Sequence, residues 1–442
     1  MKRFKYFFRA ILAVLLINLT TEVVAQDFRG NYSKESSAQM DDASSPTSEA
    51  TSPTDEISRQ APVWLDSVDI SLLTCGPGQE VWSYYGHTAL RIEDKAHGND
   101  LAVNWGMFSF NQDFFILRFV FGLTDYQIGI FPMSRFIAEY SYEGRWVKQQ
   151  RLALTREEKM KILAAIDENN QEANRTYRYN FFYDNCTTRA RNMIVKNLGA
   201  HDTDFKNVDA QSTYRQEIHR WNENHRWARF GNDLLLGYMA DRPINKEEWE
   251  FLPENLLKDF EVEARKDTST LQDKHVDVYP AQARYIKLVD STFYVLPPQA
   301  EVTSSESITP RMVFVTFGIA IILLSIIELK KKKNFWWMDT LLFLLTGLPG
   351  LILLAMVFSQ HPTVQINFQM LILNPLNLFF LYPVVKRLRK EKMYWYYNVW
   401  GTLLVISLLM QIWQDYAEGM AFLALSLLVR YATKSTLYVL KH

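Results

Sequence analysis

Excess charge, clustered histidines and cysteine are all scarce in this sequence of 442 residues. Lys and Arg number 48 against 49 Asp and Glu, so the net charge is −1 and nothing suggests a nucleic-acid partner. The eight histidines lack the spacing of metal ligands, and we expect neither a metal nor another cofactor. The two cysteines, Cys75 and Cys186, leave two possibilities open: one disulfide, or free thiols.

The N-terminus has the pattern of a secretory signal peptide over residues 1–25. Residues 1–5 are basic, Ile11–Leu19 is a short apolar core, and residues 23–25 offer small side chains for cleavage after Ala25. An uncleaved signal anchor is the alternative, and both place the next domain outside the cytoplasm. No cysteine stands at the cleavage site, so the protein is not expected to be a lipoprotein itself.

Two regions of different character follow the signal. Residues 26–62 are rich in Ser, Thr, Asp, Glu and Pro, which predicts a disordered linker. Residues 63–300 are predicted to form an α+β domain. Its strands are expected at Val68–Thr74, His87–Ile92, Leu101–Phe108, Gln127–Phe131 and Trp146–Leu152. Its clearest helices begin at the capping box Thr155–Glu158 and near Asn185 or Cys186, the second ending at Gly199.

Residues 311–442 are predicted to form an all-α bundle of five transmembrane helices. Each apolar run is near or above the roughly 20 residues needed to cross a ~30 Å hydrocarbon core. The runs are Met312–Leu329, Phe335–Phe358, Phe368–Val385, Tyr394–Trp413 and Met420–Leu440. Asn374, Pro375 and Asn377 interrupt the third run, and we expect Arg430 and Lys434 in the last run to snorkel to the inner face.

The charges between these runs predict their orientation. The first connection holds Lys330–Lys333, and the third holds five Lys or Arg within 386–392. The second connection has neither Lys nor Arg, and the fourth has only Asp415 and Glu418. Because positively charged loops stay inside, the first run travels inward from an exported domain. The signal peptide and the loop charges thus predict the same topology.

Two segments of the exported domain carry candidate chemistry: residues 85–92, YGHTALRI, and residues 183–189, YDNCTTR. Cys186 begins a predicted helix, where free N–H groups and the helix dipole favour a thiolate. A strand histidine beside it, His87, would complete a nucleophilic pair, and Asn104 on the next strand is best placed to orient the imidazole. Taken alone, His87 is equally a structural histidine, and Cys186 a buried thiol or half of a disulfide.

Several segments together resemble the Lnb family, which joins a periplasmic domain to a transmembrane domain. They are residues 73–80 (LTCGPGQE), 85–91 (YGHTALR), 104–108 (NWGMF), 185–188 (NCTT), 231–237 (GNDLLLG), 361–362 (HP) and 374–376 (NPL). The resemblance implies a circularly permuted papain-like, NlpC-type fold in the exported domain, and a lipoprotein N-acyltransferase of the bacterial inner membrane. His87 and Cys186 match the family's His and Cys, and Asn104 is the expected third member.

The resemblance also implies the reaction and its partners. A membrane phospholipid would donate an acyl chain to Cys186, and the α-amine of a diacylated lipoprotein would accept it. Asn185 or Thr187 is expected near the oxyanion, and His361 is expected in the outward loop facing the exported domain, where it would contact head groups. The aromatic stretch Phe114–Phe121 is either a lipid-facing floor or core packing.

Two other functions stay open at this point. NlpC-type folds usually serve cell-wall cysteine peptidases or amidases, although five transmembrane helices exceed what an anchor requires. A non-catalytic membrane scaffold is the second alternative, and the His and Cys in matching motifs weigh against it. Both alternatives lack the need for lipid access that the acyltransferase has.

Overall fold

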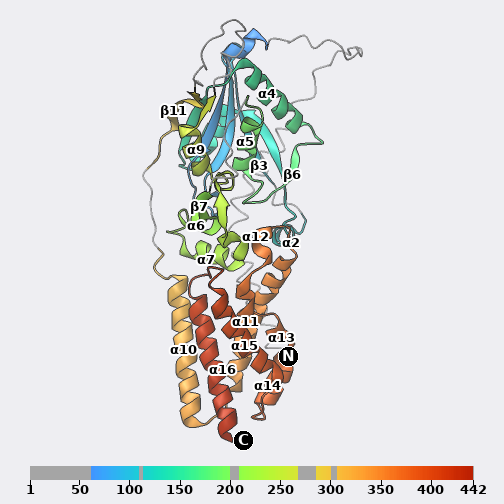
Figure 1. Cartoon of the computed structure of the whole chain (residues 1–442), viewed down its shortest axis with the longest axis vertical. Helices are drawn as coiled ribbons and strands as arrows, with labels where there is room; N and C mark the ends of the chain where they lie inside the picture. The colour runs from blue at the N-terminus through green and yellow to red at the C-terminus, as the bar shows by residue number, and fades with distance from the viewer. Residues whose placement is uncertain (1–60, 109–112, 200–208, 267–284, 300–305, 442) are drawn as a thin grey trace, which may run out of the picture.

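The computed structural model describes residues 61–108, 113–199, 209–266, 285–299 and 306–441. The predicted signal peptide and nearly all of the predicted linker lie outside these residues. Three parts follow one another along the long axis of the molecule (Figure 1). We call them the sheet domain (described residues up to 199, and 253–299), the neck (209–252) and the helical domain (306–441).

The sheet domain is built on one antiparallel sheet of seven strands in the order β11-β5-β1-β2-β3-β4-β6. The strands are β1 (Val68–Cys75), β2 (His87–Asp94), β3 (Asn99–Met107), β4 (Asp125–Pro132), β5 (Val147–Leu152), β6 (Thr176–Arg178) and β11 (Val289–Leu296). All five predicted strands are confirmed. The edge strands β6 and β11 were not predicted, because β6 is very short and β11 lies in a stretch read as a polar connection.

Helices cover both faces of this sheet. On one face, α4 (Arg156–Asn170), α5 (Cys186–Val195) and α9 (Pro253–Val262) contribute to a core that includes Leu72, Leu90 and Val103. On the other face, α3 (Met133–Tyr142) packs in a cluster with Leu73 and Ala89. Residues adjacent in β1 therefore point into different cores, and β1 is buried on both faces. This double burial explains why β1 reads as a nearly continuous apolar run.

The two predicted helices of the sheet domain are present, with one boundary corrected. The capping box opens α4, since Glu158 N donates to Thr155 Oγ1 and Thr155 N donates to Glu158 Oε2. Helix α5 begins at Cys186 but ends at Val195, before the predicted end at Gly199. The N–H of Gly199 instead donates to Glu158 Oε1 at 2.9 Å, which joins the end of this segment to α4.

The neck lies between the sheet and the helical domain (Figure 1). Its elements are β7 (Asp209–Thr213), α6 (Tyr214–His219), α7 (Arg226–Leu235), η4 (Tyr238–Asp241), β8 (Pro243–Asn245) and α8 (Lys246–Trp249). Helix α7 is strongly amphipathic, and its residues Phe230, Leu234 and Leu235 pack against the core of the helical domain. An amphipathic helix at this position joins a polar domain to an apolar one.

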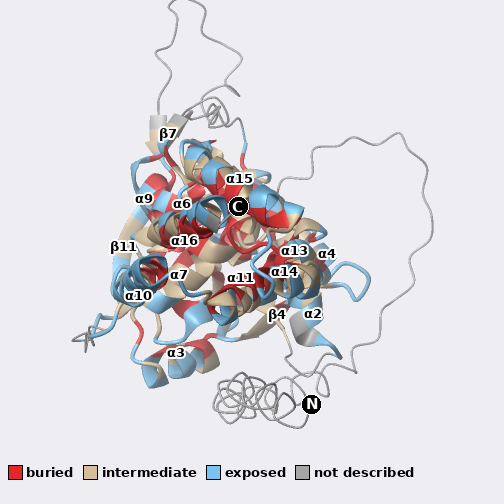
Figure 2. Ribbon diagram, turned by 90° about the horizontal axis from the view of Figure 1, so that it is seen from below, coloured by how far each residue is buried: buried red, intermediate tan, exposed pale blue. Residues whose placement is uncertain are grey.

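The helical domain contains two helices that are long and apolar enough to cross a membrane, α10 (Pro310–Lys331) and α11 (Trp336–Val357). A shorter apolar helix, α15 (Trp395–Met410), packs with α16 (Met420–Lys441). Figure 2, seen from the end of this domain, shows buried residues of α11 and α16 on the sides that face the bundle interior. The first, second, fourth and fifth predicted runs are thus helical.

The third predicted run is not one helix, which corrects the sequence-based expectation. It is divided among η6 (Phe368–Leu371), α13 (Leu376–Phe379) and α14 (Leu381–Leu388), and the short helix α12 (Pro362–Gln365) precedes it. Pro375 has no N–H to donate, and the Asn374 side chain accepts from Leu376 N at 2.9 Å, an alternative to a helical bond. Asn377 donates to Thr346 Oγ1 on α11 at 2.8 Å, so the broken segment is satisfied by its neighbour.

The expectation that Arg430 and Lys434 snorkel to the inner face is wrong. Arg430 is fully buried and forms ion pairs with Glu328 on α10 and Asp339 on α11. Lys434 contacts the same two carboxylates, with its Nζ 2.6 Å from Glu328 Oε1. Two cations and two anions from three helices make a compensated cluster, because a buried charge needs a partner. A hydropathy profile reads one helix at a time and misses such pairing.

Candidate functional site

His87 and Asn104 come together because they occupy neighbouring strands. Ala89 of β2 pairs with Asn104 of β3, so His87 lies two residues along the same face. His87 Nε2 lies 2.5 Å from Asn104 Oδ1. An amide oxygen only accepts, so Nε2 carries the proton and Nδ1 is left as an acceptor. The Asn104 amide is oriented in turn by donating to Met107 Sδ at 3.7 Å.

Cys186 is the first residue of α5, the helix that packs on β2 and β3. Its half-buried thiol hydrogen-bonds the imidazole of His87. Thr187 Oγ1 lies 3.9 Å from Cys186 Sγ and is fixed by Thr88 Oγ1 at 3.0 Å. The structure therefore brings Cys186, His87 and Asn104 into one connected group, although 98 residues lie between His87 and Cys186 in the sequence.

The pKa values of this pair favour a reactive thiol. Burial raises the pKa of Cys186, but the charge and hydrogen bond of His87 lower it further than burial raises it, helped by the Thr88 N–H and the Thr187 hydroxyl. The net effect is to lower the pKa of Cys186 from 9.0 to about 7. Burial lowers the pKa of His87, whereas the neighbouring thiolate and Asn104 raise it, and the net pKa is raised above 6.5. A thiolate–imidazolium pair is thus favoured near neutral pH.

Gly106 lies near the end of β3, beside both His87 and Cys186. Its φ is +104°, a backbone conformation that side chains rarely adopt, and the β3–β4 register shifts between Trp105 and Met107 at this point. A Cβ here would lie 3.8 Å from His87 Cε1 and 4.0 Å from Cys186 Cβ. The glycine lets the chain turn beside the pair, and the sequence reading assigned it no role.

The side chain of Asn185 caps the helix that carries Cys186. Its Oδ1 accepts from the N–H groups of Thr187 and Thr188 at 2.8 and 2.9 Å. Its Nδ2 donates to the carbonyls of Phe181 and Phe251 at 2.7 and 2.9 Å. All the hydrogen-bonding capacity of this side chain is used in holding the start of the helix.

The same capping leaves the first N–H of the helix without a partner among the described residues. The first N–H groups of a helix have no acceptor within it. Asn185 satisfies those of Thr187 and Thr188. The N–H of Cys186, the first in α5, has no acceptor among the described residues, so a hydrogen-bond donor stands free beside the thiol.

We expect Asn185→Ala to destabilise the protein by about 2 to 4 kcal/mol, because a helix cap is lost and two buried carbonyls lose their donor. Thermal unfolding of the purified protein in detergent measures this as a lower midpoint. Asn197→Ala is the matched control, since Asn197 makes one side-chain bond, to Met193 O, at the other end of the same helix segment. Equal midpoints for the two variants would contradict the capping role.

Cys75 is a free, buried cysteine rather than half of a disulfide. Both cysteines are free thiols, so the disulfide alternative is not realised. Cys75 pairs in register with His87 on the neighbouring strand. Its burial raises its pKa to about 12, although Arg145 and the Tyr140 hydroxyl act in the opposite direction. Cys75 therefore stays protonated at neutral pH, where Cys186 ionises.

His361 lies at the joint between the sheet domain and the helical domain. Its ring is close to Gly122, where a Cβ would lie 3.1 Å from His361 Nε2. The neighbouring Gln360 donates its N–H to Phe121 O at 2.9 Å, and its side chain accepts from Arg178 at 2.9 Å. The structure thus places His361 in a loop that contacts the sheet domain.

The fold and site define a class of protein: a sheet domain with a thiol–imidazole pair, seated through a neck on a helical membrane domain. Comparison with family models matches residues 56–219 to the Lnb N-terminal periplasmic domain and residues 302–441 to the Lnb transmembrane domain. The chain belongs to the Lnb family, and it is a membrane protein with an exported domain. Searches of curated proteins and of solved structures gave no significant match.

Proposed function

We propose that this protein is a lipoprotein N-acyltransferase of the bacterial inner membrane. The observation that carries the proposal is the Cys186–His87–Asn104 group in a domain joined to membrane helices through many polar contacts. Its layout is that of a circularly permuted papain-like site, with the histidine strand before the cysteine helix. We further propose that α10, α11, the broken segment 362–388, α15 and α16 make the five crossings of the membrane.

The first half of the proposed reaction loads the enzyme. The proton of Cys186 moves to His87 Nδ1, and the thiolate attacks the carbonyl carbon of a phospholipid ester. The Cys186 N–H holds the oxyanion. The ester C–O bond then breaks, the leaving oxygen takes the proton from His87, and a lysophospholipid departs. The acyl chain remains on Cys186 as a thioester.

The second half transfers the chain to the acceptor. The α-amine of the S-diacylglyceryl-cysteine attacks the thioester carbonyl, and the C–S bond breaks. His87 takes a proton from the amine and returns it to the Cys186 sulfur, which restores the starting thiol. The product is an amide, so the acceptor becomes a triacylated lipoprotein. Water must be excluded between the two halves, because hydrolysis of the thioester would waste the acyl chain.

The position of the site supports access to lipid. One end of the sheet, where β1 and β3 finish and β2, β4 and β5 begin, faces the neck and the helical domain (Figure 1). After β3 the chain leaves this end of the sheet and forms α2 (Phe115–Val120) beside α12. Three apolar side chains at α2, Phe114, Leu117 and Phe119, are more than half exposed.

This exposure favours the lipid-facing reading of Phe114–Phe121 over core packing. An exposed group of large apolar side chains beside membrane helices is typical of a surface that meets lipid. We therefore propose that α2 dips into the outer leaflet and guides an acyl chain toward Cys186. The contact from Gln360 N to Phe121 O fixes α2 against the end of α11.

We expect Phe119→Glu to raise the KM for phospholipid vesicles about tenfold, because burying one large apolar side chain in lipid contributes about 1.5 to 3 kcal/mol. Steady-state acyl transfer against vesicle concentration measures it. Val63→Glu is the control, since Val63 is as exposed but lies on η1 (Val63–Ser67), at the far end of the sheet domain. A KM for Phe119→Glu equal to that of the control would overturn the role of α2.

One experiment separates the proposed function from its alternatives. The protein is expressed in cells that lack their own N-acyltransferase, and lipoprotein N-termini are examined by mass spectrometry. A third acyl chain supports the acyltransferase. Altered muropeptides with unchanged lipoproteins would support a cell-wall peptidase or amidase, and no change in either would support a scaffold.

A further inference from the structure

We propose that α7 positions the catalytic histidine, and that it does so by joining the His87 loop to the helical domain through Tyr85, Asn232 and Gln369. This inference rests on the proposed function only in treating His87 as the partner of Cys186. The three residues are positioning residues, since none of them contacts the thiol in the structure. The consequence is that the Cys–His pair is fully formed only when the neck is seated on the helical domain.

The first step of this connection starts two residues before His87. The Tyr85 side chain is buried, and its hydroxyl accepts a hydrogen bond from Asn232 Nδ2 of α7 at 2.6 Å. The Asn222 side chain, in the loop before α7, pairs with the same hydroxyl at 3.2 Å. The adjacent Tyr84 stacks on His225, with ring centroids 3.9 Å apart. The last part of the loop that leads into His87 is therefore bound by the neck.

The second step joins α7 to the helical domain. The carbonyl of Asp233, next to Asn232, accepts from Gln369 Nε2 at 2.8 Å. Gln369 is fully buried, and its Oε1 accepts from Ala417 N at 3.0 Å, which ties it to the segment before α16. One glutamine side chain thus bonds both α7 and the segment that leads into α16.

Backbone hydrogen bonds just after α7 hold the neck close to the helical domain. Gly237 N donates to Thr363 O at 2.7 Å, and Tyr238 N donates to Ile366 O at 2.9 Å. A Cβ on Gly237 would lie 2.1 Å from Ile366 O, so a side chain at this position would force the two domains apart. The segment 231–237, GNDLLLG, which the sequence reading singled out without a role, forms this junction.

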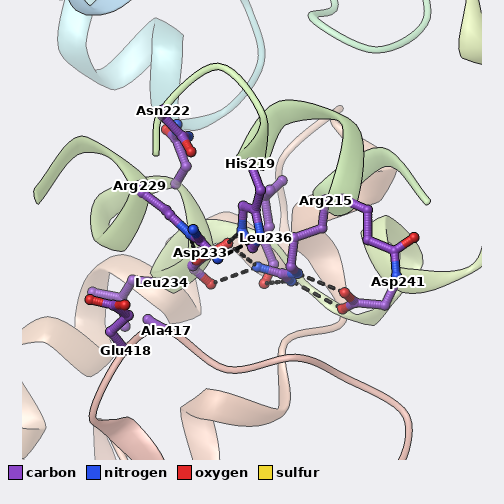
Figure 3. A network of polar contacts seen from close by, with 12 residues as sticks. Arg215, His219, Asn222, Arg229, Asp233, Leu234, Leu236, Asp241, Ala417 and Glu418 are labelled. Carbon is purple, nitrogen blue, oxygen red and sulfur yellow. Dashed lines mark hydrogen bonds and ion pairs between the residues drawn. The ribbon is translucent and has the colours of Figure 1, made fainter. Parts of the chain in front are cut away.

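A buried ion cluster keeps the end of α7 rigid (Figure 3). Arg215 of α6 is almost completely buried and donates to Asp233 Oδ1 at 2.9 Å and to Asp241 Oδ1 at 2.7 Å. His219 Nε2 lies 2.8 Å from the same Asp233 oxygen. Because Asp233 is fixed in this way, a displacement of Gln369 also displaces the adjacent Asn232, and the end of α7 does not deform instead.

The test uses the full-length protein in lipid nanodiscs and the variants Tyr85→Phe, Asn232→Ala and Gln369→Ala. Alkylation of Cys186 by iodoacetamide is followed against pH by peptide mass spectrometry, together with kcat and KM for acyl transfer. Each variant should lower kcat by about 10- to 100-fold, because small misplacements of reacting groups have effects of that size. The KM for phospholipid should stay within about twofold, and the alkylation midpoint should move to higher pH as the Cys–His pair loosens.

Tyr416→Phe is the matched control, since it also removes a hydrogen-bonded tyrosine hydroxyl, but one that bonds Ser407 O within the helical domain. Wild-type kcat and an unchanged alkylation midpoint in Tyr85→Phe would overturn the proposal. So would a loss of thermal stability without a change of midpoint, because that result marks a purely structural contact. Acyl transfer missing from the wild type would count against the proposed function alone, and the alkylation profiles would still decide the positioning role.

Discussion

Cys186→Ala is expected to abolish N-acylation while the protein stays inserted in the membrane. Without the thiol no thioester forms, and a residue that serves as nucleophile is worth on the order of 10⁴-fold or more in rate. The variant retains the helix cap, because Asn185 bonds the backbone of Thr187 and Thr188 rather than the Cys186 side chain. Mass spectrometry of lipoprotein N-termini, in cells lacking their own N-acyltransferase, measures the loss.

Cys75→Ala provides the matched control for this loss. Cys75 lies in the strand next to His87, is buried and has a pKa raised by that burial, so it takes no part in the proposed chemistry. The control should keep most of its activity, reduced only by the packing lost in the cluster beneath α3. Full acylation by Cys186→Ala, or equal losses in the two variants, would remove Cys186 as the nucleophile.

His87→Ala is expected to move the ionisation of Cys186 upward by two pH units or more. His87 is what holds the pKa of Cys186 at about 7, and burial alone acts to raise it above 9.0. The thiolate is present above the folded-state pKa, so the wild type should alkylate with a midpoint near pH 7 and the variant above pH 9. At pH 7 the alkylation rate should fall about 10-fold, since a more basic thiolate offsets part of its scarcity by higher nucleophilicity.

Acyl transfer by His87→Ala should fall further than alkylation does. The reaction also needs His87 to protonate the leaving lysophospholipid, and proton transfer by a positioned side chain contributes about 10²- to 10⁴-fold. The rate of acyl transfer by Asn104→Ala should lie between the rates of the wild type and His87→Ala. This variant keeps the imidazole in place but removes the partner of its Nε2. An alkylation midpoint that stays near pH 7 in His87→Ala would mean that another group lowers the pKa of the thiol.

The sequence predicts the site well where local patterns decide the structure. His87 begins a strand, Asn104 lies on the next strand, and Cys186 opens a helix with Asn185 before it. Strand alternation and helix capping are short-range effects, so these positions can be read without the rest of the fold. Their meeting at one sheet edge depends on the antiparallel pairing and on α5 packing against β2 and β3, which local patterns do not specify.

The errors of the sequence reading share a physical cause. Arg430 and Lys434 are buried because Glu328 and Asp339 of other helices neutralise them. In each case a partner distant in sequence supplies the free energy, and periodicity or hydropathy within one segment carries no information about it.

The sequence reading did not predict the role of the neck, which connects the sheet domain to the helical domain. Helix α7 is short, and its apolar residues face the helical domain rather than the core of its own domain. Its amphipathic pattern was available in the sequence, but the pattern does not say which domain covers the apolar side. In the proposed function, this joint would keep the sheet domain directed toward lipid.

Detection of an acyl group on Cys186 tests the proposed chemistry most directly. The purified full-length protein is incubated with phospholipid and no acceptor, quenched in acid, and its peptides are analysed by mass spectrometry before and after neutral hydroxylamine. We predict an acyl chain on the peptide that contains Cys186, removed by hydroxylamine because it is a thioester and absent from His87→Ala over the same time. Lysophospholipid release with an unmodified Cys186, or an acyl chain on another residue, would contradict the mechanism.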